Sequence, residues 1–113
     1  SADNAANERE KTEAFLRAFS KGADDFNAAL VDKTLGEDAA EDMIKLIHKY
    51  VYADRPYEKA APSIRNGAMR INKNAAMNLD NIKAQLAWFK SEGLVDSSIT
   101  FETLVDDSYV ASQ

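Results

Sequence analysis

The sequence has no cysteine among its 113 residues, and it has only two prolines, four glycines and one tryptophan. The lack of cysteine excludes a disulfide framework and a thiolate site, and it leaves the redox compartment open. A run of about 20 apolar residues, which a membrane-spanning helix needs, is also missing. The first ten residues, SADNAANERE, lack the basic and apolar regions of a signal peptide. We therefore expect no membrane insertion.

Positive charge is also in short supply. The 14 lysines and arginines are outnumbered by 19 aspartates and glutamates, which gives a net charge of −5 and an isoelectric point near 4.8. Nucleic-acid binding gains affinity from counterion release at a positive surface, so this balance argues against it. A chain of 113 residues suits one domain with a modest core.

One segment departs from the acidic balance. Between Arg55 and Lys73, five basic residues accompany a single acidic residue, Glu58. We interpret this run as a solvated surface, because charge runs usually only face water. A site for an anion or a partner is the alternative.

The clearest helix signal begins at Asn78, whose side-chain oxygen can accept a hydrogen bond from a free backbone N–H of the first turn. Gly93 stands where a helix end favours a left-handed residue, and Leu94 supplies the apolar contact that accompanies such a cap. The pattern predicts a helix over about 79–92. Its apolar residues recur at spacings of three, four and three, which places them on one face: Leu79, Ile82, Leu86 and Phe89.

A second long helix is predicted over about 8–31, after a cap at Asn7. Gly22 lies on its apolar face and costs about 1 kcal/mol relative to alanine, which suggests a close helix crossing there. Aromatic stripes at helical spacing are far more often core than a cofactor-binding box. The core or interface candidates are the bulky residues of the two helices: Phe15, Phe19, Phe26, Leu30, Leu86, Trp88 and Phe89.

A third helix is predicted over about 38–52, with acidic residues crowding its first turn. Such residues suit the positive end of the helix dipole, and no calcium-loop spacing supports a metal site among them. His48 stands beside the apolar stripe of this helix. Without an identifiable nucleophile, acid or second ligand, we interpret His48 as a half-exposed structural residue.

The remaining segments predict short elements. Pro62 limits one helix to about 56–61, and the density of asparagine predicts irregular structure over 63–77. A short helix over about 101–106 follows a Thr100 cap. The predicted fold class is all-α, with about three main helices plus short ones. The predicted organisation is a disordered tail over 1–7 and a single helical domain over 8–110.

The C-terminal part of the sequence resembles that of solute-binding proteins of ABC importers, in the group that binds nitrate, sulfonates and thiamine precursors. Those proteins often close with a helix of the type Q-x-x-W/F-x-x-x-x-G-L/V, then a short acidic helix and D-x-S-Y/F-V. The matching residues here are Gln85, Trp88, Gly93, Leu94, Asp106, Ser108, Tyr109 and Val110. Tyr109 and Val110 are expected to pack back on the body of the domain.

The resemblance implies a C-terminal segment that braces one lobe of a two-lobed, periplasmic or otherwise extracytoplasmic receptor. The implied partners are the remainder of the binding protein, an ABC importer permease through it, and a small-molecule ligand held mostly by the absent part. The family needs about two to three times this length. We therefore expect the chain to be a piece of a longer protein, with any export signal upstream of Ser1.

A freestanding helical module that binds a partner protein is the alternative function. An enzyme is not expected, because no catalytic, metal-binding or phosphate-binding constellation is visible, and no cofactor is implied. The ligand-binding residues are not identifiable from the sequence. If the chain is a fragment, its uncovered apolar faces favour self-association, most simply as a two-fold dimer.

Overall fold

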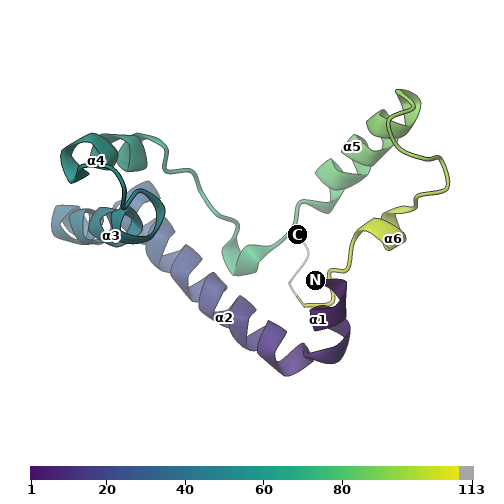
Figure 1. Ribbon diagram of the computed structural model, residues 1–113, viewed down its shortest axis with the longest axis horizontal. Helices are drawn as coiled ribbons and strands as arrows, with labels where there is room; N and C mark the ends of the chain where they lie inside the picture. Colours follow the sequence, from purple (N-terminus) through teal and green to yellow (C-terminus); the bar gives the residue numbers. More distant parts are fainter. Residues whose placement is uncertain (110–113) are drawn as a thin grey trace. The chain divides into compact units, whose positions relative to one another are not determined.

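The computed structural model describes residues 1–109, and Figure 1 gives its ribbon. All regular structure in this part of the chain is helical, which confirms the predicted all-α class. The elements in chain order are α1 (Ala2–Asn7), α2 (Arg9–Phe26), the π-helix η1 (Asn27–Val31), α3 (Gly36–Val51), α4 (Tyr57–Asn66), the 3-10 helix η2 (Lys73–Ala75), α5 (Leu79–Ser91) and α6 (Phe101–Leu104).

The chain divides into two compact units, and this division differs from the predicted single domain over 8–110. The central unit is Phe19–Lys73, and the terminal unit combines residues 1–18 with the described residues from Asn74 onward. The division arises because the well-buried apolar residues are concentrated in the central unit. In the described residues of the terminal unit, the only buried hydrophobic residue is Ala76.

The core of the central unit is small and lies where η1, α3 and α4 meet. Ile44 of α3 is its largest fully buried side chain, at 0 % exposure. Most other members are alanines, whose short side chains allow helix backbones to approach closely. The buried cluster consists of Ala29, Leu30, Ala40, Ile44, Ala60 and Ile64. Partly buried residues, including Phe26, Met43, Ile47 and Tyr57, surround it.

The helix α3 agrees with its prediction to within two residues. Glu37 and Asp38 occupy its first turn, and His48 and Lys49 its last. Both pairs complement the helix dipole, because negative charge is favourable at the N-terminal end and positive charge at the C-terminal end. The same helix buries Ala40 and Ile44 against its neighbours, so local and tertiary preferences agree here.

The helix α4 corrects two predictions, because it continues through Pro62 to Asn66. The sequence predicted a helix only to about 61 and irregular structure over 63–77. An interior proline removes one backbone hydrogen bond and disfavours the helix by about 3 kcal/mol. Burial of Ala60 and Ile64, on either side of Pro62, offsets this cost. Non-helical backbone begins only after Gly67, and Asn74 adopts a left-handed φ of 56°, which asparagine tolerates.

The helix predicted over 8–31 forms along its length, but its last turn is a π-helix. The N–H of Asp32 donates to the carbonyl of Asn27 at 2.8 Å, a five-residue step that widens the turn. The predicted close crossing at Gly22 is wrong, because a Cβ added there meets no described atom within 4 Å.

The first residues also differ from their prediction. The segment 1–7 was expected to be disordered, whereas it contains the helix α1. Ser1 caps it, since its hydroxyl accepts from the N–H of Asn4 at 3.2 Å, and the Asn7 side chain donates to that of Asp3 at 2.7 Å. Polar side chains, not apolar burial, account for this short helix.

Truncation of Ile44 tests the position of the core. Ile44→Ala should lower the free energy of unfolding by about 2–5 kcal/mol, the usual effect of emptying a filled core site. Leu46→Ala is the matched control on the same helix, because Leu46 is 51 % exposed and should change stability by under about 0.5 kcal/mol. Urea unfolding followed by circular dichroism measures both. Equal effects of the two substitutions would contradict this core.

Candidate functional site

The seven apolar candidates separate into buried and exposed residues. Leu30 is buried in the core cluster, and Phe26 and Leu86 are half-buried. The other four are exposed, so of the two roles predicted for them, core or interface, they do not take the core role: Phe15 at 67 %, Phe19, Trp88 at 55 % and Phe89 at 37 %. Within its own unit, each of these four side chains keeps at least 37 % of its surface exposed.

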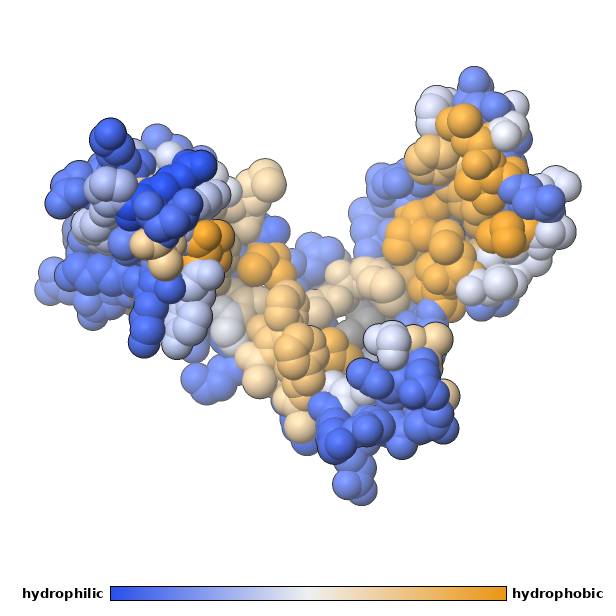
Figure 2. All heavy atoms as spheres, viewed as in Figure 1, coloured by the Kyte–Doolittle hydropathy of each residue, from blue (hydrophilic) through white to orange (hydrophobic). Residues whose placement is uncertain are grey.

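The helix α5 carries two exposed aromatic side chains, Trp88 and Phe89. Figure 2 shows hydrophobic side chains gathered over this helix. The rings of Trp88 and Phe89 pack edge to face, with centroids 5.1 Å apart and planes inclined at 70°. Leu94, just after the helix, is also exposed. We call the half-buried and exposed apolar residues in and just after the C-terminal part of this helix the α5 face: Leu86, Trp88, Phe89 and Leu94.

The two ends of α5 form as predicted. The Asn78 side chain accepts from the N–H of Asn81 at 3.0 Å. At the other end, Gly93 has a left-handed φ of 68°, and the N–H of Leu94 donates to the carbonyl of Phe89 at 2.9 Å. This six-to-one bond is typical of a Schellman C-cap, which requires the positive φ that glycine supplies. Both caps are local, so α5 forms even though its apolar face is not covered.

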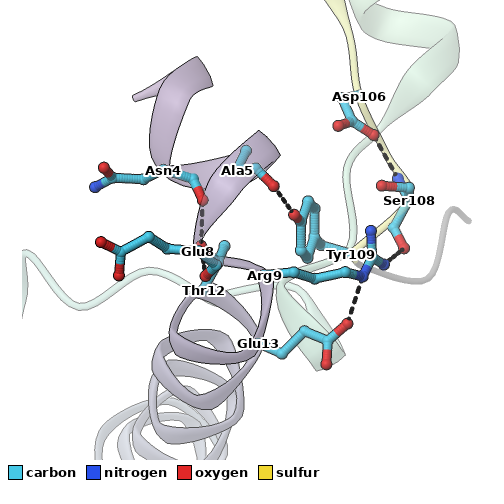
Figure 3. A network of polar contacts seen from close by, with 9 residues as sticks. All are labelled: Asn4, Ala5, Glu8, Arg9, Thr12, Glu13, Asp106, Ser108 and Tyr109. Carbon is cyan, nitrogen blue, oxygen red and sulfur yellow. Dashed lines mark hydrogen bonds and ion pairs between the residues drawn. The ribbon is translucent and has the colours of Figure 1, made fainter.

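The C-terminal motif residues meet the start of the chain within the terminal unit (Figure 3). Tyr109 donates a hydrogen bond to the carbonyl of Ala5. The Arg9 guanidinium lies 4.3 Å from the centroid of the Tyr109 ring and donates to the carbonyl of Ser108 at 3.4 Å. Tyr109 therefore contacts the start of the chain, at α1 and the first residue of α2, and Val110 lies outside the described residues.

Asp106 stabilises the turn that leads to Tyr109. Its carboxylate accepts from the N–H of Ser108 at 3.0 Å. Hydrogen bonds from the side chain and backbone of Ser108 lower the pKa of Asp106, because they favour the charged form. Asp96 and Ser98 repeat this arrangement, with the Ser98 N–H 2.8 Å from the carboxylate. These turns are structural and bring no reactive group into a cleft.

Polar side chains of α3 and α4 form the main charged cluster of the central unit. Arg65 binds Glu37 at 2.7 Å and Glu41 at 3.5 Å. Tyr57 donates a hydrogen bond to Glu41, and His48 packs edge-on against Tyr57 with ring centroids 5.4 Å apart. The Nε2 atom of His48 lies 2.7 Å from the carbonyl of Arg55. His48 is half-buried and bonded to backbone, in agreement with its interpretation as a structural residue.

The basic segment 55–73 does not present its charges together. Arg65 is engaged by α3, and Arg70 forms an ion pair with Asp32. Arg55 lies over the Tyr52 ring, 5.2 Å from its centroid. These separate partners support the interpretation as ordinary surface.

The described residues offer little else that resembles a reactive site. No group of three or more histidine, aspartate or glutamate side chains in them is placed to hold a metal ion. A hollow of about 530 Å³ beside α1 and the start of α2 is lined by Ser1, Asn4, Glu8, Lys11 and Phe15. Its Lys11 and Glu8 side chains pair with each other, and both face solvent, at 81 % and 44 % exposure. No helix in residues 1–109 is long and apolar enough to cross a membrane.

Comparisons with protein-family models, with curated proteins and with solved structures gave no match.

Two features of the central unit were missed by the sequence analysis. Asn27 is buried and bonded to the backbone of Ile71, and Tyr57 is bonded to Glu41. The burial of Asn27 had a weak signal in the sequence, because a polar residue stands there between the apolar positions Phe26 and Ala29. The hydrogen bond between Tyr57 and Glu41 had none, because the two residues are 16 positions apart on different helices.

The Tyr57 hydroxyl provides a pH test of the charged cluster. Its hydrogen bond to Glu41 is the main cause that raises its pKa from 10.0 to about 12, followed by burial and the Glu41 charge. Because the folded-state pKa is raised, the stabilisation is fully present below about pH 10 and is lost as the pH rises toward 12.

We expect the unfolding midpoint in urea to fall between pH 10 and 12 more steeply in the wild type than in Tyr57→Phe. The exposed Tyr50→Phe serves as the matched control and should keep the wild-type slope. An unchanged slope in Tyr57→Phe would contradict the role of this hydrogen bond.

Proposed function

We propose that this chain is the C-terminal helical segment of an extracytoplasmic solute-binding protein of an ABC importer. In this role it braces one lobe of a two-lobed receptor for a small molecule. Its partners are the remainder of that protein and, through it, the importer permease. Ligand capture belongs mostly to the remainder, and the segment contributes no catalytic chemistry.

The α5 face is the observation that carries the proposal. Both caps of α5 are complete, so the helix is well defined, yet its bulkiest side chains are exposed. Monomeric soluble proteins rarely leave contiguous apolar surface of this kind uncovered unless it is a contact surface. A lobe of a larger receptor is a partner of the right kind, because amphipathic helices bury their apolar face against a neighbouring element.

A further observation supports the same proposal. The motif residues that carry the resemblance adopt the conformations that their types favour, with Gly93 left-handed and Asp106 in a turn with Ser108.

A freestanding helical interaction module is the second candidate. The observation that favours it is the separate core of the central unit, which shows that Phe19–Lys73 has buried apolar contacts of its own. The two candidates differ in what covers the α5 face. In the first it is a lobe encoded in the same reading frame, and in the second it is another protein.

A docking experiment tests the proposed partner. The coding sequence upstream of Ser1 should contain a lobe-sized segment in the same frame, and that segment is produced separately. The chain has a single tryptophan, so labelling with 5-fluorotryptophan gives one ¹⁹F resonance that reports on Trp88. Addition of the unlabelled upstream segment should shift this resonance and remove its sensitivity to D₂O, because Trp88 becomes buried.

Two variants on α5 make the docking test specific. Phe89→Ala should weaken docking by about tenfold or more, as expected for a central aromatic contact. Asp80→Ala, at an exposed position of the same helix, should leave the affinity unchanged. Sedimentation of the chain alone, at each concentration used for docking, measures how much of it forms the two-fold dimer that the exposed α5 face favours. An upstream sequence without a lobe, or an unshifted Trp88 resonance, would contradict the proposal.

A further inference from the structure

Asn27 is the only buried polar or charged residue among residues 1–109, with 7 % of its surface exposed. Its side-chain amide makes two hydrogen bonds to a single residue 44 positions along the chain. Nδ2 donates to the carbonyl of Ile71 at 2.7 Å, and Oδ1 accepts from the N–H of Ile71 at 3.0 Å. The amide thus satisfies both backbone polar groups of Ile71, much as a neighbouring β-strand would.

This pairing requires the chemistry of an amide side chain. Asparagine presents a donor and an acceptor side by side, whereas a carboxylate only accepts and an aliphatic side chain does neither. Asn27 is also the first residue of η1, where the helix changes from the α to the π form. Such π turns occur frequently at functional positions, and this one carries the buried amide that contacts Ile71.

The residues around Ile71 form a segment that we call the strap, residues 68–72. The strap follows the end of α4 and has no helix or strand (Figure 1). Ala68 packs against the core cluster. Arg70 forms an ion pair with Asp32, just after η1. Asn27 lies between these contacts and binds the backbone of the strap directly.

We propose that Asn27 is a two-point latch that holds the strap on η1, so that the strap opens as a local unit when the latch is broken. The core formed by α3 and α4 stays folded during this opening, because only Ala68 of the strap packs against it. The ion pair is a weaker attachment than the latch. Both of its side chains are about half exposed, and exposed pairs contribute little. The latch is independent of the function proposed above.

Limited proteolysis of the full chain measures the latch, because the strap contains the trypsin-sensitive bond Arg70–Ile71. In the wild type the latch protects this bond. Asn27→Leu keeps a similar size but leaves the N–H and carbonyl of Ile71 unpaired. Cleavage into fragments 1–70 and 71–113, identified by mass, should be faster by about tenfold or more, given the cost of two unpaired buried groups.

The control is Asn81→Asp, at an exposed position of α5 where the Asn81 side chain accepts from Gln85 at 2.5 Å. The introduced carboxylate can still accept the hydrogen bond from Gln85, so this substitution should leave cleavage after Arg70 unchanged. Cleavage of Asn27→Leu at the wild-type rate would overturn the proposal. The protection of the Ile44 and Ile64 amides against hydrogen exchange is measured in parallel. If Asn27→Leu lowered the protection of these two core amides as well as that of the strap, the central unit would be opening as a whole. That result would also overturn the proposal.

The variant Asn27→Asp tests whether the latch needs both its donor and its acceptor, or only a buried polar side chain. The introduced carboxylate still accepts from the N–H of Ile71 but has no proton to donate to the Ile71 carbonyl. Protonation restores the donor, so the latched state binds this proton more tightly than the open state and the pKa of the introduced carboxyl is raised. Latching is therefore present at low pH and is lost as the pH rises through that pKa.

The measurement is the protection factor of the Ile71 amide in the full chain at about pH 5 and pH 7. Asn27→Asp should gain protection on acidification, and the wild type should not. Equal protection of the variant at both pH values would overturn the two-point latch. The charged groups on the elements around the latch are common to both proteins and cancel in this comparison, among them Lys21, Asp24, Asp25, Asp32, Lys33, Glu37, Asp38, Glu41, Asp42, Lys45, Arg65, Arg70 and Lys73.

Discussion

Burial of Ile44 between η1, α3 and α4 is the interaction on which the central unit depends. Three of its five neighbours in the cluster are alanines, so the helices approach closely, and Ile44 is the largest side chain that is fully buried there. Well-packed interiors tolerate few voids, which makes such a small core sensitive to truncation of Ile44. The ion pairs of Arg65 and the Asn27–Ile71 bonds then fix the surrounding segments at the edge of this core.

Dependence on tertiary burial sets the limit on how far the fold could be predicted from the sequence. The helix ends that depend on local caps were predicted: Asn78 and Gly93 cap the two ends of α5, and Thr100 caps the start of α6. The continuation of α4 through Pro62 could not be predicted, because it depends on burial of Ala60 and Ile64 against η1 and α3, and a local sequence pattern does not specify that contact. Periodicity identified the face that contains Phe89, but it does not tell whether anything covers that face.

The candidate site shows the same division. The left-handed C-cap at Gly93 was predicted because it depends on local chemistry, whereas the contacts of Asp106 and Tyr109 were not. Asn27 and Tyr57 were missed because their partners, Ile71 and Glu41, come from other elements. The contrast between a covered core and uncovered aromatic side chains underlies the proposed role, in which a lobe of a larger receptor provides the missing surface.

The central claim is that stability is concentrated in the core around Ile44, while α5 lacks a comparable packed interior. One urea titration of the dilute chain, followed by the methyl resonance of Ile44 and by Trp88 fluorescence, tests it directly. Regions with few buried contacts open at lower free energy than the core. The account predicts that the Trp88 transition precedes the Ile44 transition. Coincident transitions would contradict it, because they would mean that α5 unfolds as one cooperative unit with the core.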